Sequence, residues 1–231
     1  NGHYTGSYFE FDNKRFGDIA EIVDYIDNSN TLATKIAQAE AETEQNPTEA
    51  QKEAGNYKKG HVRIGQFNIT VENPKGSMRR GTDANGNPWE TTMQNTYGYI
   101  RGTEGVDGDH IDVFLTNDID GWNGRRVYVV DQYNEDGTFD EHKVMLGFND
   151  EDDARNAYFA NYSDDWADKR KIVMTSANLE DFEKWINSSH RKTKPFAEYK
   201  SVPAGETKAI SPTDRIAEID TQMADLKKQA D

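Results

Sequence analysis

The sequence contains no cysteine, and this absence excludes disulfide bonds, thiolate metal sites and cysteine nucleophiles together. A chain without cysteine fits a reducing compartment, so we expect a cytoplasmic protein. Basic residues are also scarce: 27 Lys and Arg face 42 Asp and Glu, for a formal net charge of −15. Because affinity for a nucleic-acid backbone depends on Lys and Arg that neutralise phosphates, we expect no nucleic-acid partner.

Long apolar runs are missing as well. No stretch approaches the roughly 18 consecutive apolar residues of a membrane-spanning helix, and the chain opens with no signal-peptide pattern. We therefore expect a soluble protein that binds no membrane. The hydrophobic content of 34% over 231 residues is enough for one domain with extensions. Because the first residue is Asn1 rather than Met, we expect either a piece cut from a longer protein or an artificially trimmed chain.

The middle of the chain reads as short strands joined by glycine turns. Alternating apolar residues predict strands over 61–64 and 67–71, on either side of a turn at Gly65, and a further strand over 126–130. The alternation over 111–115 predicts a strand with one buried face. Several short strands with glycine turns are typical of a barrel or sandwich.

Helical patterns dominate the chain before these strands. A short strand over 8–11 precedes an amphipathic helix over 19–26. Residues 32–54 favour helices, which Asn46-Pro47 interrupts because the residue before a proline avoids the helical conformation. We therefore place a helical extension at residues 1–55.

Helices are also predicted after the strands. We expect two of them, over about 149–161 and over 178–188 with Asn178 as its cap, to cover one side of the barrel. Residues 201–231 read as a linker and a helix, whose apolar stripe we expect to pack within the same chain. The stripe consists of Ile216, Ile219, Met223 and Leu226.

Carboxylates are concentrated at the start of the strand over 111–115, where Asp107, Asp109 and Asp112 lie within six residues. Carboxylates held this close repel one another unless cations or protons intervene. Oxygen ligands favour hard divalent ions over zinc, so the pattern predicts a Mg²⁺ site, with Mn²⁺ as an alternative. A calcium loop is disfavoured because Ile111 occupies its third ligand position.

The residues around this motif resemble a known family. Tyr97-Gly-Tyr-Ile, followed at a fixed distance by Asp107-Gly-Asp-His-Ile-Asp-Val, is similar to the signature of the soluble family I inorganic pyrophosphatases. Residues of about 56–200 resemble, more closely, the inorganic-pyrophosphatase-like domain of large polyvalent proteins in phages and conjugative elements. The segments 56–61 and 191–196 contribute to that likeness.

The resemblance implies a fold and a division into domains. The implied fold is α+β: a small mixed or antiparallel β-barrel, related to the OB fold, covered by helices and extended by helices at both termini. Residues 1–55 then form the N-terminal helical extension, residues 56–200 the pyrophosphatase-like catalytic domain, and residues 201–231 the C-terminal linker and helix.

The resemblance also implies metal ligands, carried over position by position. Asp109 falls on the carboxylate proposed to take a proton from the attacking water. Two alternatives stay open downstream, since Asp131 competes with Asp136 and Asp140 competes with Glu141. The implied metal ligands are Glu72, Asp107, Asp112, Asp136 and Glu141.

Phosphate contacts are implied in the same way. The family's first motif tyrosine falls on Tyr97, and a lysine two residues beyond the last metal carboxylate falls on Lys143. His110 departs from the family pattern, which usually has proline there, and adds a side chain able to carry a proton. The implied substrate contacts are Tyr97, Lys143, Arg79 or Arg80, and Lys192, with Arg191 and Lys194 as competitors of Lys192.

Three hypotheses about function follow. The first is Mg²⁺-dependent hydrolysis of inorganic pyrophosphate, or of a related small phosphoanhydride, by metal-activated water. The second is a metal- or phosphate-binding module without turnover, carried in a larger mobile-element polyprotein whose other domains are its partners. The third is a scaffold in which the outer helices matter most. The carboxylate motif and the tyrosine at its matching distance favour the first.

Overall fold

The computed structural model describes residues 3–4, 8–11, 13–29, 31–82, 86–163, 170–188 and 191–201. The chain divides into two compact units, Asn1–Ala197 and Glu198–Asp231, and most of the described residues belong to the first. The predicted C-terminal helix with its apolar stripe lies outside the described residues. Within the described ranges, no helix is both long enough and apolar enough to cross a bilayer.

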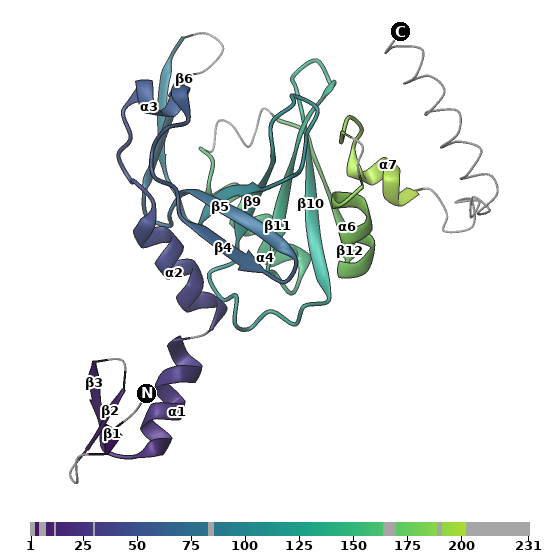
Figure 1. The fold of residues 1–231 in the computed structure, drawn as a ribbon. Helices are drawn as coiled ribbons and strands as arrows, with labels where there is room; N and C mark the ends of the chain where they lie inside the picture. Colours follow the sequence, from purple (N-terminus) through teal and green to yellow (C-terminus); the bar gives the residue numbers. More distant parts are fainter. Residues whose placement is uncertain are drawn as a thin grey trace, which may run out of the picture. The chain divides into compact units, whose positions relative to one another are not determined.

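A seven-stranded sheet forms the centre of the first unit, in the order β12-β10-β11-β9-β8-β5-β4 (Figure 1). Its ladders are antiparallel except the one between β9 and β11, which is parallel. The fold is therefore mixed α+β with a mostly antiparallel sheet. In chain order the strands are β4 (His61–Ile64), β5 (Phe67–Asn73), β8 (Tyr97–Ile100), β9 (Ile111–Leu115), β10 (Arg126–Tyr133), β11 (Phe139–Leu146) and β12 (Ile172–Asn178).

The strands predicted from alternation are confirmed. β4 and β5 pair across the turn at Gly65, whose φ of 58° lies in the left-handed region that glycine adopts most easily. The hydrogen-bonded order nevertheless stays open, with β4 and β12 as its edges in the described residues, so the expected closed barrel is not seen there. β12 runs directly into α6 (Leu179–Ile186), and α2 (Leu32–Glu42) packs on β4. A helix rather than a partner strand therefore accompanies each edge.

Helix boundaries follow the capping residues. The predicted cap Asn178 is confirmed, because its side chain accepts a hydrogen bond from the backbone N–H of Asp181. Asp150 caps α4 (Glu151–Ala160) in the same manner, within the range predicted from the sequence. Thr48 and Gln51 form a capping box at the start of α3 (Glu49–Ala54). The remaining described elements after β5 are the hairpin of β6 (Met78–Thr82) and β7 (Pro88–Thr92), and the helix α7 (Phe196–Ser201).

We expected a helical extension at residues 1–55 with one short strand over 8–11; the strand is confirmed, but it belongs to a small sheet that was not expected. The region contains the helix α1 (Ile19–Ser29) close to its predicted place, and also a three-stranded antiparallel sheet. Its strands are β1 (His3–Tyr4), β2 (Phe9–Phe11) and β3 (Lys14–Phe16). Phe9 pairs with Phe16, whose ring lies 5.3 Å from that of Tyr25 on α1. Aromatic side chains, which favour strands, therefore account for the strands in this segment.

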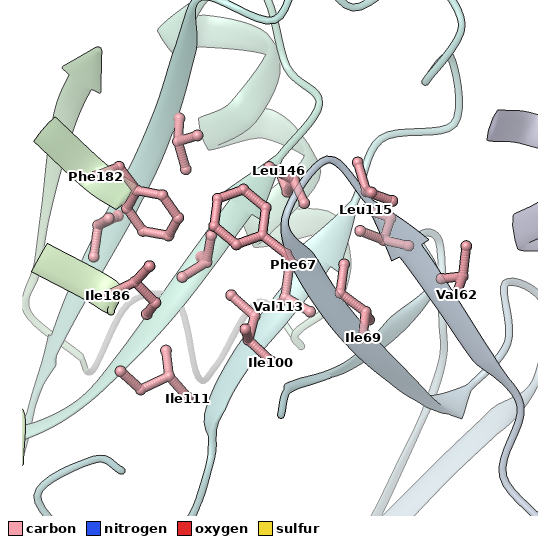
Figure 2. Close-up of a cluster of buried hydrophobic side chains, with 14 of the residues drawn as sticks. Val62, Phe67, Ile69, Ile100, Ile111, Val113, Leu115, Leu146, Phe182 and Ile186 are labelled. Atoms are coloured by element: carbon pink, nitrogen blue, oxygen red, sulfur yellow. The ribbon is translucent and has the colours of Figure 1, made fainter. Parts of the chain in front are cut away.

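Two hydrophobic cores lie on opposite faces of the central sheet. On one face, Val113 and Leu115 of β9 pack with Phe182 and Ile186 of α6 (Figure 2). On the other face, Phe114 of β9 packs with residues of β8, β10, β11 and α4. The expectation of a single buried face for β9 is therefore wrong, because helices cover both sides of the sheet. Asp112 is the one polar side chain on this strand.

Candidate active site

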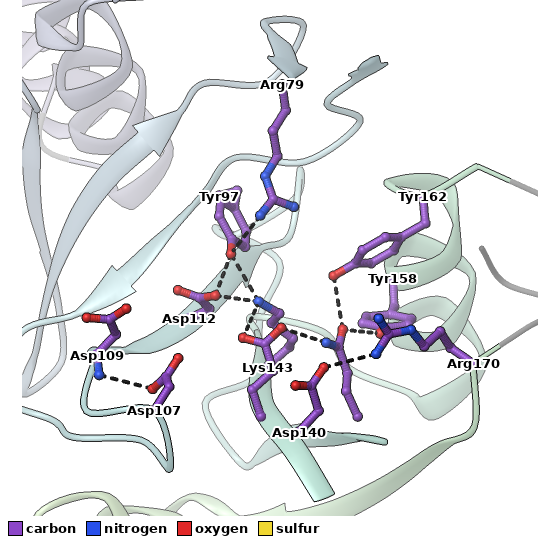
Figure 3. Close-up of polar contacts among 12 residues, drawn as sticks. Arg79, Tyr97, Asp107, Asp109, Asp112, Asp140, Lys143, Tyr158, Tyr162 and Arg170 are labelled. Atoms are coloured by element: carbon purple, nitrogen blue, oxygen red, sulfur yellow. Dashed lines mark hydrogen bonds and ion pairs between the residues drawn. The ribbon is translucent and has the colours of Figure 1, made fainter. Parts of the chain in front are cut away.

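A group of charged and polar side chains extends the second core at one end of the sheet (Figure 3). Lys143 on β11 pairs with Asp112 on β9 in the parallel ladder, so both side chains point to the same face. Glu141 lies two residues before Lys143 and shares that face. Tyr97 on β8 pairs with Phe114, two residues after Asp112. It therefore joins the group on the same face, from the strand next to β9 that lies away from β11. Strand register therefore assembles the site.

Hydrogen bonds centre on the Lys143 ammonium. It donates to Glu141 Oε2 at 2.7 Å and to the Tyr97 hydroxyl at 3.2 Å, and it forms an ion pair with Asp112 Oδ2. The Tyr97 hydroxyl in turn donates to Asp112 Oδ2. Arg79 on the β6–β7 hairpin approaches from above, with Nη2 at 3.5 Å from the Tyr97 hydroxyl and its guanidinium at 4.6 Å from the ring centroid. We call these five residues the lysine cluster.

Burial and charge together set the protonation states of the lysine cluster. Burial alone would lower the pKa of Lys143, but Asp112, Tyr97 and Glu141 outweigh it and hold that pKa well above its ordinary value. Burial raises the pKa of the Tyr97 hydroxyl well above its ordinary value, although Lys143 opposes the shift. At neutral pH the lysine therefore stays charged and the tyrosine stays a neutral donor.

Sequence reasoning missed three residues that support the cluster. Gln132 on β10 donates from Nε2 to Glu141 Oε1 at 2.7 Å. Its own oxygen accepts from the hydroxyls of Tyr158 at 2.5 Å and Tyr162 at 3.1 Å. The two tyrosines are four residues apart, a helical spacing that could have drawn attention to them, whereas nothing in the apolar run around Gln132 marks it as a site residue.

The remaining motif carboxylates lie in a loop before β9, at residues 104–109, which we call the aspartate loop. Asp107 Oδ1 accepts a hydrogen bond from the Asp109 backbone N–H at 3.0 Å, around a left-handed Gly108 with φ of 93°. Figure 3 shows Asp107 and Asp109 next to Asp112, outside the lysine cluster.

Other residues implied by the resemblance lie elsewhere in the described structure. Glu72 pairs with Lys59 at 2.6 Å, and Arg80 pairs with the exposed Glu90 at 3.2 Å on the hairpin. Asp136 lies at the exposed β10–β11 turn, where its Oδ1 accepts from the Thr138 hydroxyl and backbone N–H. These hydrogen bonds lower the pKa of Asp136. The described contacts therefore bring none of the three to the lysine cluster.

The downstream alternatives and the basic residues after α6 also find other partners. Asp131 lies on the opposite face of the sheet, where it accepts hydrogen bonds from the first amides of α7. Asp140 pairs with Arg170 at 3.1 Å. Lys192 donates to the Ser188 carbonyl at 2.7 Å, and burial lowers the pKa of its ammonium group. His110 stacks on Tyr99 with ring centroids 4.9 Å apart.

The carboxylates near the cluster suit a hard divalent cation by their chemistry. Asp112 uses Oδ2 for Tyr97 and Lys143, while no described residue hydrogen-bonds to its Oδ1 or to the carboxylate of Asp109. In the ranges that the structure describes, no three Asp, Glu or His side chains form a ready-made cage. Because Mg²⁺ keeps several waters and needs only one or two carboxylates, this oxygen-rich edge fits it.

The architecture so far is that of a mixed α+β domain whose sheet presents a cationic and carboxylate site at one end. A family model described as Inorganic Pyrophosphatase matches residues 49–187, which is more than half of the chain. The chain therefore belongs to the inorganic pyrophosphatase family, whose members are hydrolases. No match is found among the curated proteins.

Two solved structures are similar to this chain. One, an inorganic phosphatase from Anaplasma phagocytophilum, is 14% identical and matches over 56% of this chain and 90% of its own, with a TM-score of 0.31. The other is an inorganic pyrophosphatase from Coxiella burnetii, 14% identical over 51% of this chain and 89% of its own, with a TM-score of 0.32.

Proposed function

We propose that this chain hydrolyses inorganic pyrophosphate, or a closely related small phosphoanhydride, with Mg²⁺ or Mn²⁺ as cofactor. The observation that carries the proposal is the convergence of Arg79, Tyr97 and Lys143 beside Asp112. Two permanent cations and a neutral hydroxyl donor around one point suit the oxygens of a phosphate group. Membership of the pyrophosphatase family supports the same reaction class.

Asp109 is the proposed proton acceptor. Its carboxylate is exposed in the aspartate loop, and no described residue occupies it with a hydrogen bond. In the reaction, the oxygen of water bonds to one phosphorus, the bridging P–O bond breaks, and the proton of the water passes to Asp109. Lys143 and Arg79 then stabilise the charge on the phosphate that leaves.

The metal is proposed to bind at Asp107, Asp112 and Glu141, with Glu72 and Asp136 as further assignments that the resemblance implies. A bound divalent ion lowers the pKa of its water and neutralises phosphate oxygens. Gln132 and Lys143 keep the Glu141 carboxylate in a single orientation, because each engages one of its two oxygens. Tyr97 and Lys143 do the same for one oxygen of Asp112.

The direct test measures phosphate released from pyrophosphate at neutral pH, with Mg²⁺ and with a chelator. We expect metal-dependent release by the wild type and a loss of roughly 10²- to 10⁴-fold in Asp109→Asn, the range for a removed general base. Asp24→Asn, at an exposed position of α1, is the matched control and should keep full activity. No release from pyrophosphate or any small phosphoanhydride would refute the proposal.

A second candidate is a module that binds metal or phosphate without turnover, inside a larger polyprotein. The position of Asp136 favours it, because Thr138 holds at the hairpin turn a carboxylate that the family uses near the metal. Mn²⁺ binding without hydrolysis would support this candidate. Two further proposals rest on the sequence alone: a setting in polyvalent proteins of phages and conjugative elements, and a location in the cytoplasm. Sequencing the reading frame on both sides of this chain tests the first of them.

A further inference from the structure

We propose that Arg191 is a positioning residue that fixes the aspartate loop for metal binding by holding its backbone. This inference rests on the proposed function, since it concerns the carboxylates assigned there to metal and proton transfer. Arg191 begins a segment of residues 191–197, which we call the strap. The strap contacts the aspartate loop at one end and the face of the sheet opposite the lysine cluster at the other.

Three consecutive carbonyls of the aspartate loop accept hydrogen bonds from the strap. Arg191 Nε donates to Gly105 O at 2.8 Å, and Arg191 Nη2 donates to Val106 O. The backbone N–H of Lys192 donates to Glu104 O at 2.9 Å. These carbonyls belong to the residues immediately before Asp107. Their positions therefore fix the backbone position from which the Asp107 side chain extends.

The guanidinium of Arg191 also lies against the turn between the two loop carboxylates. A Cβ placed on Gly108 would stand 3.4 Å from Arg191 Nη2. The guanidinium therefore lies against the backbone of this turn, and it also forms a partly exposed ion pair with Glu104, with Nε at 3.6 Å from Oε1. Because its described hydrogen bonds go to backbone carbonyls, we assign Arg191 to the support of the loop, and its candidacy as a phosphate contact stays a prediction.

The far end of the strap is anchored to buried groups. Asp131, which is fully buried, accepts from the backbone N–H groups of Phe196 at 2.8 Å and Ala197 at 3.0 Å. Nε2 of the buried His142 lies 3.1 Å from the Lys194 carbonyl. The ring of Phe196 is also fully buried, with its centroid 4.7 Å from that of Trp185 on α6. Arg191 thus extends from a rigid support.

The aspartate loop depends on the strap for contact with more distant parts of the chain, because its other described hydrogen bonds lie within it or join Thr103 to His110 and Ile111 at its base. It lies between β8 and β9 without pairing to another strand, and residues 107–110 are exposed or only half-buried. Its internal backbone hydrogen bonds run from Gly105 N to Asp109 O at 2.7 Å and from Gly108 N to Gly105 O at 3.2 Å. A turn with few bonds and two like charges opens easily unless an outside group holds it.

The test uses the whole chain and three variants. Arg191→Gln removes the charged donors. Arg191→Lys keeps the positive charge but lacks the planar guanidinium that donates two hydrogen bonds at once. Arg125→Gln changes an exposed arginine elsewhere in the chain and is the control. Amide hydrogen exchange is measured for residues 105–110 in protein treated with chelator, and Mn²⁺ binding is followed by electron paramagnetic resonance. Hydrolysis of pyrophosphate is measured as a function of Mg²⁺ concentration.

We expect exchange in the loop to accelerate roughly tenfold or more in Arg191→Gln, as for the loss of charge-assisted hydrogen bonds. Mn²⁺ should bind correspondingly more weakly, and more Mg²⁺ should be needed for half-maximal activity, while saturating Mg²⁺ restores most of the turnover. Arg191→Lys should lie between wild type and Arg191→Gln, and Arg125→Gln should match the wild type. Asp131→Asn, at the far end of the strap, should loosen the same amides by a smaller factor.

Unchanged exchange at 105–110 together with unchanged Mn²⁺ affinity in Arg191→Gln would overturn the inference. Acceleration spread evenly over the amides of the sheet would also overturn it, because Arg191 would then support the domain as a whole. If the wild type binds Mn²⁺ but does not hydrolyse pyrophosphate, only the proposed function is refuted. The inference about Arg191 can still be tested by amide exchange and by Mn²⁺ affinity.

Discussion

Asp131 and Gln132 are neighbours on β10, and His142 and Lys143 are neighbours on β11, yet each pair is divided between the two faces of the sheet. On the site face, Gln132 and Lys143 engage Glu141, whose side chain keeps 30% of its surface exposed. On the opposite face, the side chains of Asp131 and His142 are both 0% exposed. Of two adjacent residues on one strand, one therefore belongs to a site that ligands can reach, and the other belongs to a buried face that they cannot reach.

The difference between the faces comes from what covers them. On the closed face, Trp185 of α6 lies 5.1 Å from the His142 ring, and the strap adds Phe196. On the site face, Tyr158 of α4 covers the apolar part of the sheet but leaves the carboxylates near its end partly open. Polar residues that alternate along one strand therefore take opposite roles according to the elements that pack over them. The predictions that follow test this division.

Lys143→Met should have the largest effect. It leaves Asp112 and Glu141 close together and partly buried without the cation that neutralises them, and breaking such a pair costs about 3–5 kcal/mol of unfolding free energy. Urea denaturation measures the loss, and pyrophosphate hydrolysis should disappear with it. Lys184→Met, which breaks an exposed pair with Glu180 on α6, should cost less than about 1 kcal/mol. Equal losses in the two variants would contradict the special place of Lys143.

His142 should make the closed face sensitive to acid. Burial lowers its pKa to about 4, whereas an unfolded chain has histidine near 6.5. Between these values the unfolded chain binds more protons, so the unfolding free energy falls as pH drops from about 6.5 to about 4, by up to about 3 kcal/mol. Urea denaturation at several pH values should show a shallower decline for His142→Gln. The same decline as in wild type would refute the role of His142, and His61→Gln, at an exposed position of β4, is the control.

Gln132→Leu should have a smaller effect on the site face. The change removes a partner from Glu141 and from the buried Tyr158 hydroxyl, and an unsatisfied buried group of this kind costs about 1–3 kcal/mol. Thermal unfolding should show the loss, and the pyrophosphate KM should rise because Glu141 is less well oriented. Gln38→Leu, which removes an exposed hydrogen bond on α2, should change neither quantity measurably.

Asp136→Asn should have the smallest effect. In the described residues its side chain bonds only within the turn, to Thr138, so Mn²⁺ affinity and turnover should stay within about twofold of wild type. Isothermal titration with Mn²⁺ and a phosphate-release assay measure the two. A loss of roughly tenfold would instead place Asp136 among the metal ligands, as the resemblance to the family implies.

Local features of the fold were predictable because local patterns specify them. The alternation over 126–130 marks β10, and Asn178 marks the start of α6, since strand period and helix capping act over a few residues. The open order of the sheet was not predictable, because it depends on which helix accompanies each edge. Of the three short strands before α1, β2 falls in the predicted range, whereas β1 and β3 span only two and three residues, too few for an alternation to show.

The candidate site was predictable to the extent that the resemblance to the family covers its residues. Tyr97, Asp112 and Lys143 were singled out by the resemblance, and the structure brings them together. Gln132 and the support given by Arg191 were not recognised, because each acts through contacts between residues far apart in the chain. No period or spacing in a single sequence encodes such contacts.

The parallel ladder between β9 and β11 has a consequence for folding. A slip of one residue along this ladder would turn Lys143 toward the apolar side under α6 and bring His142 beside Asp112. The misaligned chain would then leave the Asp112 carboxylate without its ammonium partner on one side, and it would bury the Lys143 ammonium together with Glu141 among apolar side chains on the other. The charge balance that suits the site to phosphate thus also acts as a proofreading signal, which penalises wrongly aligned strands before any ligand is present.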